Sequence, residues 1–326
     1  MKNTKRLSPL FVLTGFNALL ASTLSPAALV ASTDELTATQ ISSTAESRDP
    51  SANDNRGQPP GPETSLQLDL SFVPELEITD SSASFDLAIA EITLELPWFS
   101  ISASQRDFTW EGAENLPFSG GSAQPWEQLT TVELRKDFTR PIRDNLFLLS
   151  SVGVGLSFEE EVGDAYSANA LAAVVWSKSA DWSFLFGAGY SWHPEVELEF
   201  ELFPAIGFSY RQNAERGFWG SLGIPQTGMG YRFSPRSAIS FTVDADTFVT
   251  RLADDSDVAA AGYAEFVRFG VGLYYEHSLG ERFRLKLGPN FGFEGELKIH
   301  DRSGVLLSTH DLESAPGFKL EMAIGF

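Results

Sequence analysis

The chain has 326 residues and carries 44 acidic against 23 basic side chains, a net charge of −21. This balance excludes nucleic acid as an expected partner, because phosphate contacts need a basic surface. There is no cysteine, so neither a disulfide framework nor a lipid anchor on cysteine is expected. After the N-terminal segment, no apolar run approaches the length of a membrane-spanning helix, which excludes a helical membrane protein.

Residues 1–32 have the features of a secretory signal peptide. Three basic residues among the first six precede an apolar run from Leu10 to Leu20, and small residues follow. This run is too short for a transmembrane helix, which needs about 20 residues. We place cleavage after Ser32, with Ala27 as the alternative. Losing the three basic residues takes the net charge from −21 to −24, and the mature protein is expected to be exported.

Residues 33–63 are rich in Ser, Thr, Asn, Pro and Gly. Such a composition buries too little apolar surface to offset the entropy of ordering, so it predicts a disordered polar leader. A plug or a partner-binding tail is the functional alternative. It is disfavoured because a plug needs hydrophobic residues on which to fold.

From residue 64 to the end, apolar residues alternate with small, polar or charged ones, which predicts β-strands. The predicted strands are 66–72, 85–94, 99–109, 128–138, 146–156, 168–176, 182–192, 200–211, 218–224, 227–233, 238–251, 267–276, 283–296 and 318–326. In the second strand the apolar parity shifts near Ala90 and Glu91, which predicts a bulge.

Tight or basic turns, such as 140–144 and 278–282, alternate with more acidic connections at 111–125, 159–164, 253–257 and 301–313. This asymmetry is typical of outer-membrane barrels, whose short turns are periplasmic. We therefore predict an all-β fold: a transmembrane antiparallel up-and-down β-barrel of residues 64–326, with about 14 strands and both termini periplasmic. Twelve strands is the alternative, if the short pair around residues 224–226 or the second strand is misread. A soluble sandwich is disfavoured, because about 260 residues of meander would need two domains and no linker divides them.

The C-terminal strand predicts the location and the partners. Its alternate residues Met322, Ile324 and Phe326 are apolar, and the chain ends on an aromatic residue. This ending resembles the strand by which Gram-negative barrels are recognised for assembly, so we expect the barrel-assembly machinery as a partner. The expected location is the outer membrane. There the other partners are lipid and lipopolysaccharide, which divalent ions would bridge to the acidic connections.

Glycines and aromatic residues recur together in residues 184–191, 203–210, 219–225 and 228–233. With this spacing, residues 64–326 resemble a bacterial family of uncharacterised outer-membrane barrels, defined as a domain of unknown function. The resemblance implies the barrel fold. No functional residue carries over, because the family has no assigned activity.

Interior charges of both signs lead to the functional hypothesis of a narrow passive pore for small solutes. The candidate lumen-lining residues are Asp244, Asp246, Arg268, Glu276, Arg284, Lys286, Glu294, Glu296, Lys319 and Glu321. Counting from the turn before Arg282 places Glu276 near Arg284, close enough for an ion pair. A glycine on this face, Gly272, is expected to tolerate serine. A structural or surface-interaction barrel without an open channel is the alternative.

Catalysis is not expected, and neither is a cofactor or a bound metal. The pair His277 and Ser278 falls on a predicted turn, so Ser191 with His193 is the best remaining arrangement for a lipid-modifying enzyme. The acidic clusters match no calcium-loop spacing. A fatty-acid-type transporter is also a weaker alternative, because it would need an apolar lumen and an ordered N-terminal hatch.

Overall fold

The structure is a computed structural model. It describes residues 64–326 except 180, 199–200, 212–215, 225–226 and 281, and it does not describe the side chain of Asp244. The predicted signal peptide, cleavage site and polar leader lie outside the described residues. Among the described residues, no helix is long and apolar enough to cross a bilayer.

The described chain is almost entirely β-strand. The strands are β1 (Ser65–Glu77), β2 (Ser84–Glu95), β3 (Ser100–Glu111), β4 (Gln128–Arg143), β5 (Leu146–Phe158), β6 (Tyr166–Ser177), β7 (Trp182–Trp192), β8 (Leu202–Arg211), β9 (Gly217–Ile224), β10 (Thr227–Ser234), β11 (Ser237–Arg251), β12 (Tyr263–Leu279), β13 (Phe283–Gly292), β14 (Gly295–His300), β15 (Leu306–Leu312) and β16 (Ala315–Gly325). One short 3-10 helix, Ala113–Asn115, lies between β3 and β4.

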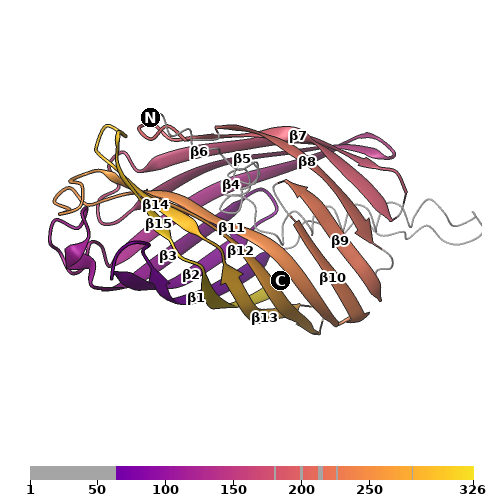
Figure 1. Cartoon of the computed structure of the whole chain (residues 1–326). Helices are drawn as coiled ribbons and strands as arrows, with labels where there is room; N and C mark the ends of the chain where they lie inside the picture. The colour runs from indigo at the N-terminus through magenta and orange to yellow at the C-terminus, as the bar shows by residue number, and fades with distance from the viewer. Residues whose placement is uncertain (1–63, 180, 199–200, 212–215, 225–226, 281) are drawn as a thin grey trace, which may run out of the picture.

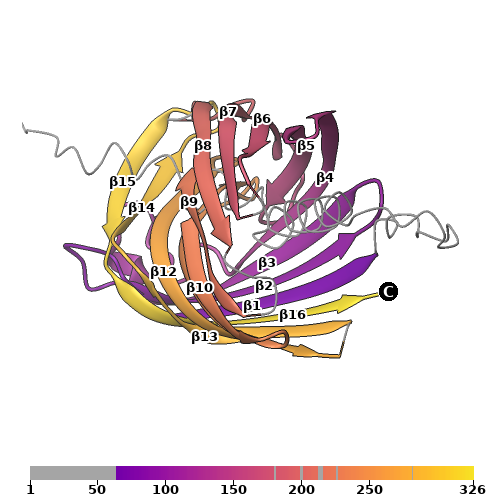
Figure 2. The same ribbon diagram turned by 90° about the vertical axis from the view of Figure 1, so that its right-hand side faces the viewer.

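Successive strands pair antiparallel, and β1 pairs with β16 to close the sheet. Strand β12 pairs with β13 along one half and with β14 along the other, so β13 and β14 are halves of one wall strand. Strands β15 and β16 form the last wall strand in the same way. The described residues therefore form a closed antiparallel barrel of 14 wall strands (Figures 1 and 2), and the prediction of 14 is confirmed. The short strands β9 and β10 belong to the wall.

The two ends of the barrel differ. At one, which we call the turn end, Phe326 N donates to Thr64 O at 2.8 Å, and connections such as 144–145 and 235–236 are short. At the other, the loop end, the connections 112–127, 193–201 and 252–262 are longer. The predicted connection 301–313 is mostly strand β15, so the hairpin tip is only 301–305.

The outer surface of the wall is apolar. Large side chains point outward around the barrel, among them Phe72, Ile92, Phe186, Ile206 and Leu273, and about half of each is exposed. A soluble protein rarely leaves so continuous an apolar surface uncovered. An outward apolar band is what a transmembrane barrel presents to lipid.

The predicted bulge in the second strand was wrong. Strand β2 pairs with β3 in one register from Ser84 to Glu95. The parity shift arises because β2 is apolar on both faces: Phe85 and Leu87 point inward and are buried, while Ile92 points outward. The bulge lies in β1, between Val73 and Leu76.

Candidate functional site: the barrel interior

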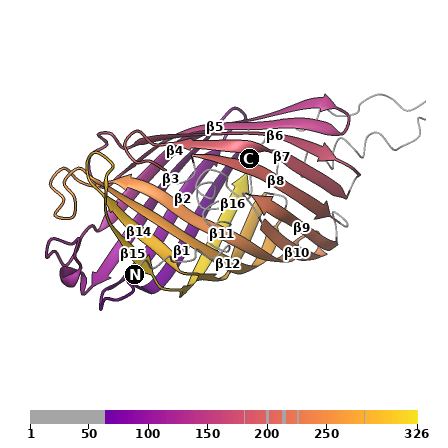
Figure 3. The same cartoon turned by 45° about the horizontal axis from the view of Figure 1, so that its top comes forward.

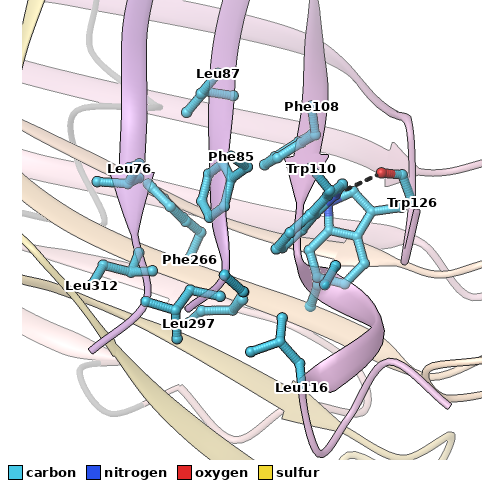
Figure 4. Packing of buried hydrophobic residues seen from close by; sticks show 14 of the residues in the cluster. Leu76, Phe85, Leu87, Phe108, Trp110, Leu116, Trp126, Phe266, Leu297 and Leu312 are labelled. Carbon is cyan, nitrogen blue, oxygen red and sulfur yellow. Dashed lines mark hydrogen bonds between the residues drawn. The ribbon is translucent and has the colours of Figure 1, made fainter. Parts of the chain in front are cut away.

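The interior at the loop end is filled by an apolar core (Figure 4). Phe85, Phe108 and Trp110 come from β2 and β3, and Trp126 comes from the connection 112–127. The ring centroids of Phe85 and Trp110 are 4.6 Å apart, and Trp110 Nε1 donates to Trp126 O at 2.9 Å. The opposite side of the core consists of Phe248, Leu252, Phe266, Leu297, Ile299 and Leu312. We call this cluster the loop-end core; its side chains pack together inside the barrel at that end.

Next to the loop-end core, an ion pair crosses the interior. Arg106 of β3 reaches Asp246 of β11 at 3.6 Å, and its guanidinium lies 4.2 Å from the ring centroid of Phe248. Its Nη1 donates to Ser104 Oγ at 3.1 Å. The pair joins two walls that are far apart in the sequence. It therefore narrows the interior where the apolar core ends.

Charged side chains line one wall of the turn-end half, on β1, β13 and β16. Lys286 Nζ lies 3.6 Å from Glu321 and 4.7 Å from the ring centroid of Tyr274. Lys319 Nζ lies 3.6 Å from Asp69. We call these residues the charged wall. The ion pairs run between neighbouring strands, so they lie along the wall and do not cross the interior.

The register corrects the expected pairing of Glu276. Its partner on β13 is Lys286, whereas Arg284 lies opposite Ser278. Glu276 accepts a hydrogen bond from Ser240 Oγ at 2.5 Å. The turn 280–282 is shorter than the count assumed, so the partner of Glu276 lies two residues further along β13 than expected.

The other predicted interior residues are dispersed. Arg268 is buried and donates to Ala315 O at 2.9 Å, and Arg284 is exposed near the turn end. Glu294 is exposed between β13 and β14. The side chain of Asp244 lies outside the described part of the chain.

Glu296 lies on the opposite face from Arg268. Gly270 pairs with Gly292 but Val267 pairs with Glu296, so one extra residue lies between β13 and β14. A one-residue shift turns every later side chain to the other face.

There Glu296 joins a buried polar cluster. Lys298 Nζ lies 3.2 Å from Glu296 and 3.8 Å from Glu265, and His300 Nε2 lies 3.0 Å from Glu265. No local pattern indicates this cluster, because alternation alone places Glu296 inside the barrel.

The predicted pair Ser191 and His193 does not form a nucleophile with its base. His193 Nδ1 accepts hydrogen bonds from the backbone N–H groups of Glu195 and Val196, at 3.3 and 3.1 Å. Burial lowers the pKa of His193 to about 4, and its ring packs edge-on against Tyr263 at 5.0 Å. Its role is to hold the connection between β7 and β8. At the other candidate, His277 Nδ1 lies 3.0 Å from Ser237 Oγ.

The predicted assembly residues lie on the strand that closes the barrel. Met322 pairs with Leu68 and Ile324 with Leu66. Ile324 and Phe326 are exposed on the outer surface at the turn end. The C-terminal residues thus lie at the seam where the first and last wall strands meet.

No family model matches the chain, and no curated protein matches it. Solved structures that resemble it are outer-membrane barrel proteins. An outer-membrane channel from Pseudomonas putida has 11% identity and a TM-score of 0.41, over 86% of this chain and 100% of that one. A Pseudomonas aeruginosa FadL homologue has 13% identity and a TM-score of 0.39, over 81% and 90%. The KdgM porin has 6% identity and a TM-score of 0.32, over 80% and 99%.

Proposed function

We propose that this protein is an outer-membrane channel that passes small solutes passively, and that the structure is its closed state. The single observation that carries the proposal is the charged wall, with its Lys286–Glu321 and Lys319–Asp69 pairs inside the turn-end half. Burying charges in a barrel that needed no water would cost several kcal/mol per ion. A wet interior avoids most of that cost.

The outer-membrane location rests on three features taken together. The wall is closed, its outer surface is apolar, and the sequence begins with a predicted signal peptide. Apart from a short stretch between β8 and β11, every wall strand among the described residues pairs with its neighbours, so few backbone groups are left unpaired in lipid, which is the condition for crossing a membrane with strands.

The proposed partners follow from the two ends. The acidic loop end faces outward and meets lipopolysaccharide through divalent ions, and the turn end faces the periplasm. The assembly machinery recognises the C-terminal strand through Met322, Ile324 and Phe326.

The test is ion selectivity in planar bilayers. Arg284 is exposed on the interior face near the turn end, so Arg284→Glu should shift the preference toward cations. Arg236→Glu is the matched control, because Arg236 is an exposed residue of the turn between β10 and β11 at the same end. An equal shift in both variants would show that the interior face around Arg284, next to the charged wall, does not line the conducting path.

A barrel without an open channel is the second candidate, and the loop-end core favours it. Wild-type protein with an intact, heat-modifiable barrel and no conductance above background would establish this candidate and end the channel proposal.

A further inference from the structure

The barrel wall contains a break in strand pairing between β8 and β11. Strand β10 pairs with β11 only as far as Thr227 opposite Val243, whereas β11 continues to Arg251. Strand β9 reaches β8 only as far as Ile206, whereas β8 begins at Leu202. Figure 3 shows β9 and β10 confined to the turn end, between β8 and β11. Among the described residues, no backbone pairing joins 202–205 to 244–250.

The break has a defined frame. Ile224 at the end of β9 and Thr227 at the start of β10 bound it toward the turn end. Toward the loop end it is bounded by the connection between β7 and β8, where Val196 and Leu198 pack against Tyr263 and Val249. Side-chain packing therefore holds the wall together here, and this is weaker than a ladder of hydrogen bonds. We call this region the lateral break.

Strand β11 turns inward at the lateral break. Its end bridges to β5, where Arg251 pairs with Phe158, and Ser157 Oγ lies 2.6 Å from Thr250 Oγ1. Ala245 and Thr247 have the parity of the outer face, yet they are only 7% and 3% exposed. Other parts of the chain cover this stretch of β11, so it does not meet lipid directly.

On the β8 side of the lateral break the interior surface is uncharged, whereas on the β11 side the interior residue Asp246 is charged and pairs with Arg106. Leu171, Phe203 and Ala205 form a buried apolar cluster with Leu185. The Phe203 ring covers Gly189, where an added Cβ would lie 1.8 Å from it. The interior positions of β6, β7 and β8 are Ser, Asn, Leu, Ala, Val, Gly and Phe until Arg211 at the turn end. This surface suits an apolar molecule and contrasts with the charged wall.

Buried hydroxyls without hydrogen-bond partners in the described part of the chain lie on β5 and β7, on the same face as this cluster, and on β11 at the lateral break. Thr247 Oγ1 on β11, Ser191 Oγ on β7 and Ser151 Oγ on β5 are buried and have no hydrogen-bond partner among the described residues. Leaving a buried hydroxyl unpaired in this way is unfavourable. A solute with a polar group would remove that cost.

We propose that the lateral break is a route by which small apolar solutes with one polar group pass between the membrane and the barrel interior. The proposal rests on the channel function above and names its solute class. The uncharged surface contacts the apolar part of the solute, and the unpartnered hydroxyls form hydrogen bonds with its polar group. The loop-end core closes the axial route, which leaves the side of the barrel as the path into the outer half of the membrane.

The chain has no cysteine, so a single introduced cysteine reports on its own site. Ala245→Cys places a thiol at the lateral break, and Ala264→Cys places one in the loop-end core. Both positions are buried alanines on neighbouring strands. In intact outer membranes, N-phenylmaleimide should label Ala245→Cys many-fold faster. Equal, slow labelling of both would mean that the lateral break does not open, and the proposal would fail.

The same modification tests transport. Uptake of N-phenylnaphthylamine, an apolar probe with one N–H group, should fall to the level of cells lacking the protein once Ala245→Cys is modified. Labelled Leu222→Cys is the control, because Leu222 faces lipid on β9 and is 51% exposed; its uptake should not change.

Ion conductance distinguishes the two proposals. Uptake that persists after modification of Ala245→Cys, with conductance intact, overturns the lateral route alone. Loss of conductance in every folded sample, wild type included, overturns the channel function on which the route rests.

Discussion

The outer face of β12 can be tested by placing arginine at two different depths in the membrane and comparing the loss of stability. Leu273 and Leu279 lie on the same outer face of the strand and are 49% and 56% exposed. Leu279 is the last residue of β12, at the turn end, whereas Leu273 lies six residues deeper. At about 3.3 Å per residue and a tilt of about 40°, the two positions differ in depth by about 15 Å.

This difference is more than half of an apolar band about 25 Å tall, so Leu273→Arg should cost about 2 to 4 kcal/mol and Leu279→Arg about 0 to 1 kcal/mol. The measurement is denaturant unfolding of the barrel from lipid vesicles, followed by tryptophan fluorescence and by heat-modifiable migration. Leu→Ala at both positions separates lost apolar area from the cost of the charge. Equal costs for the two arginine variants would refute the assignment of this face to lipid.

Three further outcomes are expected. Gly272→Ala should destabilise the barrel by about 1 to 3 kcal/mol, because an added Cβ would lie 2.2 Å from the buried Tyr274 ring; Gly220→Ala, with its nearest neighbour at 3.6 Å, is the control in the same unfolding assay. This reverses the expectation that serine would be tolerated at position 272. The pKa of His193 is lowered from 6.5 to about 4. As the pH falls, His193 is therefore protonated at a lower pH in the folded protein than in the unfolded chain. Stability should be constant above about pH 6.5 and should fall by at most about 3 kcal/mol down to about pH 4. His193→Gln should flatten that slope in unfolding titrations. An epitope inserted near Asp164 should be labelled on intact cells, and labelling only after the outer membrane is opened would reverse the topology.

The wall of the barrel could be predicted from the sequence because it follows one local rule. Alternation with a period of two, together with the turn residues, predicts the 14 wall strands. Strand β7 begins and ends where the pattern places it, at Trp182 and Trp192. Each strand carries this information in its own residues, so no knowledge of its neighbours was needed.

The interior could not be predicted in the same way, because its contents depend on register and on contacts between distant segments. Phe85 and Leu87 point into the loop-end core. Because β2 is apolar on both faces, the alternation pattern alone predicts a bulge there. One extra residue between β13 and β14 moved Glu296 to the outer face. The contact between Arg106 and Asp246 joins residues 140 positions apart, and no local pattern signals it.

The central claim is that the loop-end core closes the barrel axis, and one conductance measurement tests it most directly. The connection 112–127 contributes Leu116, Phe118 and Trp126 to that core. A variant in which residues 113–126 are replaced by a short Gly-Ser turn should conduct several times more current per channel than the wild type, provided that its barrel remains heat-modifiable. Equal conductance of the folded variant and the wild type would show that the core does not close the channel, and would contradict the account.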